Sequence, residues 1–178
     1  MADLTPFQTI GPYFAVAMPA PGLDDLADDA VPGERIRIEG RLLDGAGDPI
    51  PDGLIETWQA NAQGHYRLPD HGFVGFGRVP TDSAGAFALD TVRPGSVSGP
   101  GGTTQAPHLV VSVLARGILT RLVTRIYFAD EPANQSDPVL RLVPEARRRT
   151  LIAEPAADGT FRIDLVLQGP NEPVFFDV

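Results

Sequence analysis

The amino-acid sequence predicts an all-β protein built as a two-sheet β-sandwich. Two observations carry this prediction. Glycine (19) and proline (18) make up about a fifth of the 178 residues, and they separate short runs rich in valine, isoleucine and leucine. Several of these runs alternate polar and apolar residues, which is the period-two pattern of a half-buried strand. Many short strands at regular turn spacing are typical of a sandwich and not of a disordered chain.

The elements follow in order along one expected domain, residues 1–178. Residues 1–33 show little periodicity and predict an extended N-terminal arm, and residues 34–178 predict the β-sandwich core. Apolar runs mark strands, and clusters of Asp, Asn, Gly and Pro mark turns. The expected strands are 35–43, 54–60, 86–92, 108–115, 121–128 and 160–168, and the expected turns are 44–49, 61–64 and 81–85. One or two short helices are expected, the clearer one over 144–153, where Pro144 suits the first turn.

Composition excludes several classes of protein. The chain has no cysteine, so a disulfide scaffold and thiolate metal sites are excluded. The formal net charge of −9 argues against nucleic acid as a partner, because phosphates would be repelled. No window approaches the ~20 apolar residues that cross a membrane. The first 20 residues lack the basic segment of a signal peptide, so the chain is expected to be cytoplasmic.

The sequence His108-Leu109-Val110 is the candidate metal motif. Residues i and i+2 of a strand face the same side, so His-x-His presents two imidazoles to one metal ion. Here Val110 occupies the second position and cannot coordinate a metal. A lone histidine is more often a hydrogen-bonded core residue than a ligand. No nucleophile elbow, phosphate loop, zinc motif or Ca²⁺ loop is present elsewhere.

Five segments resemble the intradiol ring-cleavage dioxygenases in order and spacing across residues 35–178. They are WQAN at 58–61 with GHYR at 64–67, TDS at 81–83 with Gly85, VRPG at 92–95, APH at 106–108 and FRID at 161–164. The resemblance implies the β-sandwich fold of that family. It also implies O₂-dependent cleavage of catechols between the two hydroxyl-bearing carbons, at a ferric ion held by two tyrosines and two histidines. Such hard oxygen and nitrogen donors suit Fe(III).

The chain departs from the ligand pattern that the resemblance implies. Val110 replaces the second histidine, Ser-Val-Ser at 96–98 stands where one tyrosine is expected, and residues 68–72 contain no tyrosine. Three of the four ligands are therefore missing, so no metal site is expected and His108 is expected to be a vestigial ligand position. His71 is a conceivable substitute ligand, but an isolated loop histidine is more often solvated.

A two-chain subgroup of the family accounts for an intact fold without iron ligands. This chain resembles the α chain of that subgroup at QTIGPY (8–13), LARG (114–117) and PVFFD (173–177). The resemblance implies a homologous β chain as partner, which binds Fe(III), and αβ protomers in a larger oligomer. It also implies that no residue of this chain is catalytic by itself. The residues implied to line the substrate pocket shared with the β chain are Thr9, Gly11, Pro12, Tyr13 and Arg116.

Strand geometry supports a role for Arg116 outside this chain's own relic site. His108 and Arg116 are eight residues apart, or ~26 Å along an extended strand. The alternative interpretation is a surface arginine before a turn at Gly117.

The sequence therefore predicts one subunit of an Fe(III)-dependent intradiol dioxygenase, inactive without its β chain. The implied reaction opens 3,4-dihydroxybenzoate with O₂ to 3-carboxy-cis,cis-muconate, with no membrane or nucleic acid involved. The main alternative is a non-catalytic β-sandwich binding or interaction domain derived from the same family. A self-sufficient catechol dioxygenase is disfavoured by the absent tyrosines.

Overall fold

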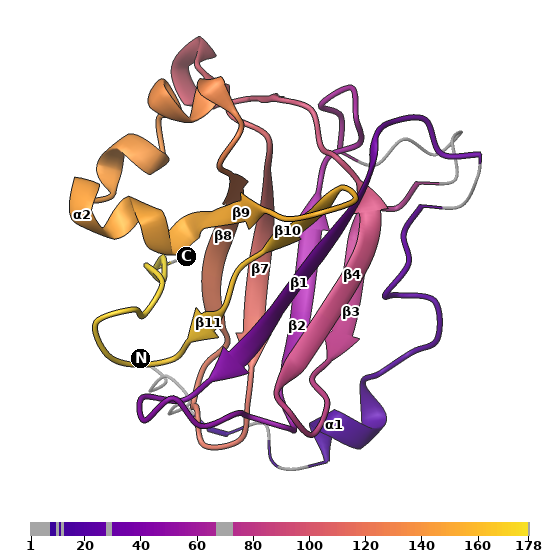
Figure 1. Cartoon of the computed structure of the whole chain (residues 1–178), viewed down its shortest axis with the longest axis vertical. Helices are drawn as coiled ribbons and strands as arrows, with labels where there is room; N and C mark the ends of the chain where they lie inside the picture. Colours follow the sequence, from indigo (N-terminus) through magenta and orange to yellow (C-terminus); the bar gives the residue numbers. More distant parts are fainter. Residues whose placement is uncertain (1–7, 10, 12, 28–29, 67–72, 178) are drawn as a thin grey trace, which may run out of the picture.

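The computed structural model describes residues 8–177 apart from 10, 12, 28–29 and 67–72 (Figure 1). The strands are β1 Arg35–Leu43, β2 Leu54–Gln59, β3 Phe76–Pro80, β4 Ala86–Val92, β5 Val97–Ser98, β6 Thr104–Gln105, β7 His108–Leu114, β8 Leu122–Phe128, β9 Ile152–Pro155, β10 Thr160–Arg162 and β11 Leu165–Val166. The α-helices are α1 Phe14–Ala17 and α2 Glu145–Arg148. The 3-10 helices are η1 Pro100–Gly102, η2 Pro132–Gln135, η3 Leu140–Leu142 and η4 Arg149–Leu151.

The long strands form two layers, which confirms the predicted sandwich (Figure 1). In one layer β1 pairs with β4 on one side and with β10 and β11 on the other. In the second layer the order is β3-β2-β7-β8, with antiparallel pairing throughout. Strand β9 joins the layers, because its first half pairs with β8 and its second half with β10.

The hydrophobic core lies between the two layers. Alternate residues of each strand point into it, as the period of two requires. The core includes Ile36 and Ile38 of β1, and Leu109, Val111 and Val113 of β7, each at most 3% exposed. The remaining positions of β7 point to the outer face of the second layer. There His108 and Ser112 are buried, whereas Val110 is half-buried.

The bounds of the predicted strands agree with the structure within one residue for β1, β2, β4, β7 and β8. The expected strand over 160–168 is interrupted between β10 and β11. At this break the Ile163 backbone N–H donates to the Glu39 carbonyl (3.0 Å), and the Asp164 carboxylate accepts from the Arg41 backbone N–H (3.0 Å). The approach is possible because Gly40 faces it: a Cβ there would lie 1.8 Å from the Ile163 carbonyl oxygen.

The predicted helix over 144–153 is confirmed as helical to Leu151, with 3-10 geometry in its last turn, and is wrong only at residues 152 and 153. Helix α2 ends at Arg148, η4 follows, and Ile152 begins strand β9. The backbone of Ile152 and Ala153 pairs with Tyr127 and Phe128 of β8, so ladder hydrogen bonds replace helical ones. Strands β3, β5, β6 and β9 were not predicted.

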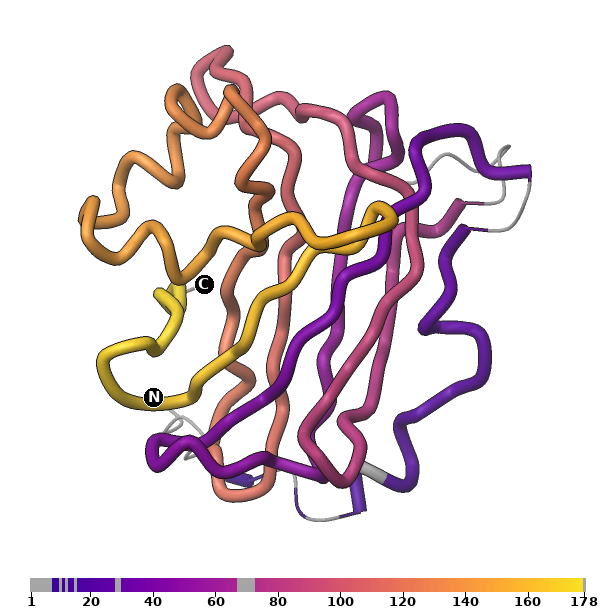
Figure 2. The backbone as a smooth tube through the Cα atoms, viewed as in Figure 1, coloured from indigo at the N-terminus to yellow at the C-terminus, as the bar shows by residue number. Residues whose placement is uncertain are grey.

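The segment before β1 contains α1 and then runs along one edge of both layers. The Arg78 backbone N–H on β3 donates to the Leu23 carbonyl, and the Leu26 N–H donates to the Asp90 carbonyl on β4, both at 2.8 Å. This segment therefore closes the sandwich at the β3–β4 edge (Figure 2). Among the described residues, no helix is long and apolar enough to span a lipid bilayer.

Candidate functional site: the outer face of the β3-β2-β7-β8 sheet

His108, the vestigial ligand position, begins β7 and is only 3% exposed. Its Nδ1 lies 2.7 Å from the Ala106 carbonyl oxygen. Because a carbonyl only accepts, Nδ1 carries the proton of a neutral imidazole. Burial lowers the pKa of His108 to about 4, and the positive charge of Arg125 acts in the same direction. His108 is thus held as a neutral, hydrogen-bonded core residue.

A fully buried carboxylate organises the chain around His108. Asp137 accepts hydrogen bonds from the backbone N–H groups of Ala106 (2.8 Å), Val139 (2.9 Å) and Leu140 (2.7 Å). It also accepts one from the Tyr127 hydroxyl (3.1 Å). Tyr127 is itself fully buried, and burial raises the pKa of its phenol. Asp137 therefore connects the 131–143 segment to the start of β7, and both of its carboxylate oxygens accept hydrogen bonds that hold this part of the fold together.

The donors near His108 do not fit ferric iron. The Nδ1 hydrogen bond leaves Nε2 of His108 as a single imidazole donor, which cannot hold ferric iron by itself. Val110 offers no second donor, and burial holds Tyr127 protonated. Tyr66 stacks on Trp58 with ring centroids 6.1 Å apart, and burial raises the pKa of its phenol. Within the described parts of the chain, no three His, Cys, Asp or Glu side chains gather where they could hold a metal. The alternative ligand His71 lies outside the described residues.

The residues predicted to serve a shared pocket lie away from His108. Arg116 follows the last residues of β7, whereas His108 is the first. The Arg116 Nε donates to the Asp52 carboxylate at 2.9 Å, and its side chain is 64% exposed. Tyr13 is 81% exposed at the start of α1.

Two more of these residues belong to the same N-terminal segment. The Gly11 backbone N–H donates to the Thr9 hydroxyl (3.3 Å), and Gly11 has a φ of +77°, a conformation that suits glycine. Pro12 lies outside the described residues. In the view of Figure 1 this indigo segment and the β7–β8 turn lie at the same end of the molecule.

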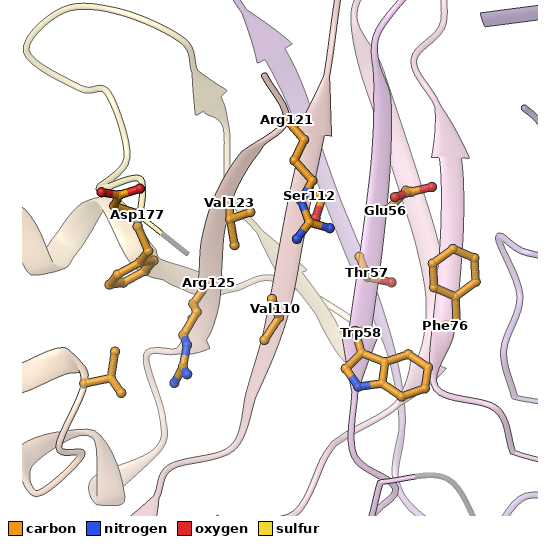
Figure 3. A pocket seen from close by; sticks show the side chains of 12 residues that line it. Glu56, Thr57, Trp58, Phe76, Val110, Ser112, Arg121, Val123, Arg125 and Asp177 are labelled. Carbon is orange, nitrogen blue, oxygen red and sulfur yellow. The ribbon is translucent and has the colours of Figure 1, made fainter. Parts of the chain in front are cut away.

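A pocket of about 670 Å³ lies on the outer face of the β3-β2-β7-β8 sheet. The side chains that define its floor and rim are Trp58, Phe76, Val110, Ser112, Arg121 and Arg125 (Figure 3). We call this hollow the sheet pocket. Val110, the position of the missing histidine, lies in its floor. The other residues of the pocket were not predicted from the sequence. Two signals were available: Val110 and Ser112 are two residues apart and so face the same side of a strand, and Trp58 is the only tryptophan of the chain.

The carboxylate of Glu56 in the sheet pocket has an ion-pair partner, whereas the two arginines of the pocket have none among the described residues. Glu56 is held by Arg78, with an N–O distance of 2.7 Å. Arg125 donates through Nη1 to the Gln105 side-chain oxygen (2.8 Å) and to the Tyr127 hydroxyl (3.2 Å), both uncharged groups. No carboxylate within 4 Å pairs with Arg125 or Arg121 among the described residues. The pocket thus offers two guanidinium groups beside an aromatic and aliphatic floor.

Comparison with known proteins places the chain in a family. A sequence model described as dioxygenase matches residues 10–169, so the chain belongs to the dioxygenase family. The chain is 40% identical to the protocatechuate 3,4-dioxygenase alpha chain of Burkholderia cepacia, over 98% of this chain and 97% of the relative. It is 42% identical to the alpha chain from Pseudomonas putida, over 97% and 96%. These matches confirm the resemblance seen in the sequence motifs.

Two further matches extend this result. The beta chain from Burkholderia cepacia is 35% identical over 77% of this chain and 66% of that protein. Among solved structures, the dioxygenase domain of a carbohydrate-binding fusion protein from Streptomyces superposes with a TM-score of 0.66 at 30% identity, covering 93% of this chain and 99% of that one. Catechol 1,2-dioxygenase from Acinetobacter, with a TM-score of 0.65 at 20% identity, supports the fold alone; it covers 80% of this chain and 55% of that one.

Proposed function

We propose that this chain is the α subunit of a protocatechuate 3,4-dioxygenase, which opens 3,4-dihydroxybenzoate with O₂ to 3-carboxy-cis,cis-muconate. The observation that carries the proposal is similarity to two alpha chains over nearly the whole length of each. The donors around His108 point in the same direction, because they do not fit iron although the dioxygenase fold is intact.

The iron belongs, in this proposal, to a homologous β chain that pairs with this chain in a larger oligomer. Support comes from the beta chain of Burkholderia cepacia, which is recognisably related to this sequence. Ferric iron bound there would draw electron density from the catechol and prepare it for O₂. An obligate partnership implies an interface of more than ~2,000 Å².

This chain would supply a wall of the partner's substrate pocket through Thr9, Gly11, Pro12, Tyr13 and Arg116. The substrate carries a carboxylate, and a pocket that prefers it needs a positive charge opposite that group. Arg116 has five N–H donors, and its ion pair with Asp52 uses the Nε one, so the others remain available to a carboxylate. Tyr13 can add one neutral hydroxyl donor.

Co-expression with a β-chain homologue tests the proposal. We expect O₂ uptake with 3,4-dihydroxybenzoate from the co-purified pair and none from this chain alone. Two proteins that separate and do not interact would contradict the assignment and favour the non-catalytic binding domain.

Substitution of Arg116 tests the pocket wall. Losing a charge-assisted hydrogen bond costs ~1.5–3 kcal/mol, so Arg116→Ala should lower kcat/KM for 3,4-dihydroxybenzoate by about ten- to a hundredfold. Tyr13→Phe should cost less, because one neutral donor is lost. Arg149→Ala is the control, since Arg149 is also exposed. Equal impairment of an uncharged catechol by Arg116→Ala would show that Arg116 does not recognise the carboxylate.

A further inference from the structure

The floor of the sheet pocket is a single cross-strand row. Trp58 of β2 lies opposite Val110 of β7, and Val110 lies opposite Arg125 of β8. Neighbouring strands are ~4.8 Å apart, so the backbones of Trp58 and Arg125 are about 10 Å apart with Val110 between them. The row therefore runs from an aromatic ring across an aliphatic patch to a cation.

A second row gives the pocket a polar edge and walls. Ser112 lies two residues beyond Val110 on the same face of β7, opposite Glu56 on one side and Val123 on the other. Phe176 pairs with Val123 through an isolated bridge and brings the C-terminal segment against this edge. Figure 3 shows the Arg121 side chain extending over the sheet toward Ser112. These walls make the face concave, with a volume in the range of small-molecule sites.

The positive charge of Arg125 has no counter-ion among the described residues. Glu56 is held by Arg78, and Asp137 is occupied by three backbone N–H groups and the Tyr127 hydroxyl. Asp177 also lines the pocket, but it lies beyond 4 Å from both guanidinium groups. A half-buried guanidinium that faces a cavity without a carboxylate favours an anionic ligand.

We propose that the sheet pocket binds a small planar aromatic carboxylate. Its ring would lie over Val110 beside Trp58, and its carboxylate would accept hydrogen bonds from Arg125, with the Ser112 hydroxyl at the side. The two cations disfavour a cationic ligand, and the apolar floor disfavours a fully polar anion such as phosphate. This site lies within one chain, needs no metal and does not depend on the proposed function.

Trp58 provides a local reporter, because it is the only tryptophan of the chain and lines the pocket. Benzoate is titrated into the full-length chain while Trp58 fluorescence is recorded. We expect a saturable change, and we expect neutral benzamide to bind about ten- to a hundredfold more weakly. Arg125→Gln should weaken benzoate binding by a similar factor, whereas Arg149→Gln, at an exposed arginine outside the pocket, should leave it unchanged.

Two results would overturn the proposal: the absence of a saturable signal up to tens of millimolar benzoate, or equal affinities for benzoate and benzamide. The comparison of ligands uses the wild-type chain, so it stands even if Arg125→Gln fails to fold. If the chain is titrated in a complex with a partner, the fluorescence of the same complex carrying Trp58→Phe is subtracted. The difference is the signal of Trp58 alone. The titration involves neither catechol nor O₂, so its failure leaves the proposed dioxygenase activity untouched.

Discussion

Protonation of His108 should make the stability of the fold depend on pH. Burial lowers the pKa of His108 from 6.5 to about 4, and the unfolded chain restores the ordinary value. Arg125 opposes its protonation, whereas the nearby Asp137 and the Ala106 carbonyl favour it to a smaller extent. Between these two pKa values the unfolded state binds more protons than the folded state. The contribution of His108 is therefore fully present above pH 6.5 and is lost as the pH falls toward 4.

The size of the effect follows from these two pKa values. Relative to neutral pH, protonation of His108 in the unfolded chain lowers the free energy of unfolding by about 1.4 kcal/mol at pH 5.5. At pH 4.5 the reduction is about 2.5 kcal/mol. The assay is urea unfolding at pH 7.5, 6.5, 5.5 and 4.5 for the wild type and for His108→Gln, which cannot be protonated in this range. The free energy of unfolding of the variant should fall less on acidification than that of the wild type, by the amounts given.

The control is Gln63→Ala, because Gln63 is exposed and its side chain does not titrate. The pH dependence of this variant should match that of the wild type. Parallel curves for the wild type and His108→Gln would mean that His108 has the same pKa in the folded and unfolded states, which contradicts the lowered pKa of the buried imidazole.

Two further predictions concern the frame that shapes the site. Asp137→Ala leaves three backbone N–H groups and the Tyr127 hydroxyl without their acceptor. In a urea titration it should therefore lower the free energy of unfolding by about 3–5 kcal/mol. Asp48→Ala, at an exposed carboxylate, is the control and should change that free energy by less than about 0.5 kcal/mol. A loss below 1 kcal/mol for Asp137→Ala would contradict its structural role. Gly40→Ala places a Cβ against the Ile163 carbonyl and should lower the free energy of unfolding by about 3 kcal/mol or more. Gly45→Ala is the control, because its Cβ meets only the Gln168 side chain, and it should lower that free energy by less than about 1 kcal/mol. Equal thermal midpoints for the two variants would rule out the close approach of Gly40 and Ile163.

The fold was predictable where the hydrophobic pattern alone decides the structure. The alternation in 35–43 and 86–92 gave β1 and β4 at their observed bounds, because one face of each strand is buried in the core. Strand β3 escaped prediction because Gly77 takes one of its inward positions and Pro80 ends it, which leaves little apolar signal. The 144–153 segment shows how tertiary pairing overrides local propensity, since Ile152 and Ala153 complete the β8 ladder.

The candidate site was predictable only in part. The sequence identified His108 and the absence of a donor at Val110 because both lie in one short motif. It could not reveal the sheet pocket, because the row of Trp58, Val110 and Arg125 depends on strand register and on the C-terminal segment that walls it. The burial of Asp137 was equally hidden, since a single aspartate in a proline-rich loop usually faces solvent.

The proposed function makes this chain the iron-free subunit of a two-chain dioxygenase. Metal analysis tests it most directly: iron is quantified in the chain purified alone and in its complex with a β-chain homologue, both expressed with ample iron. We expect no stoichiometric iron and no visible absorption band in the chain alone, and one iron per αβ pair in the complex. Stoichiometric iron in the chain alone, or two irons per pair, would contradict the proposed function.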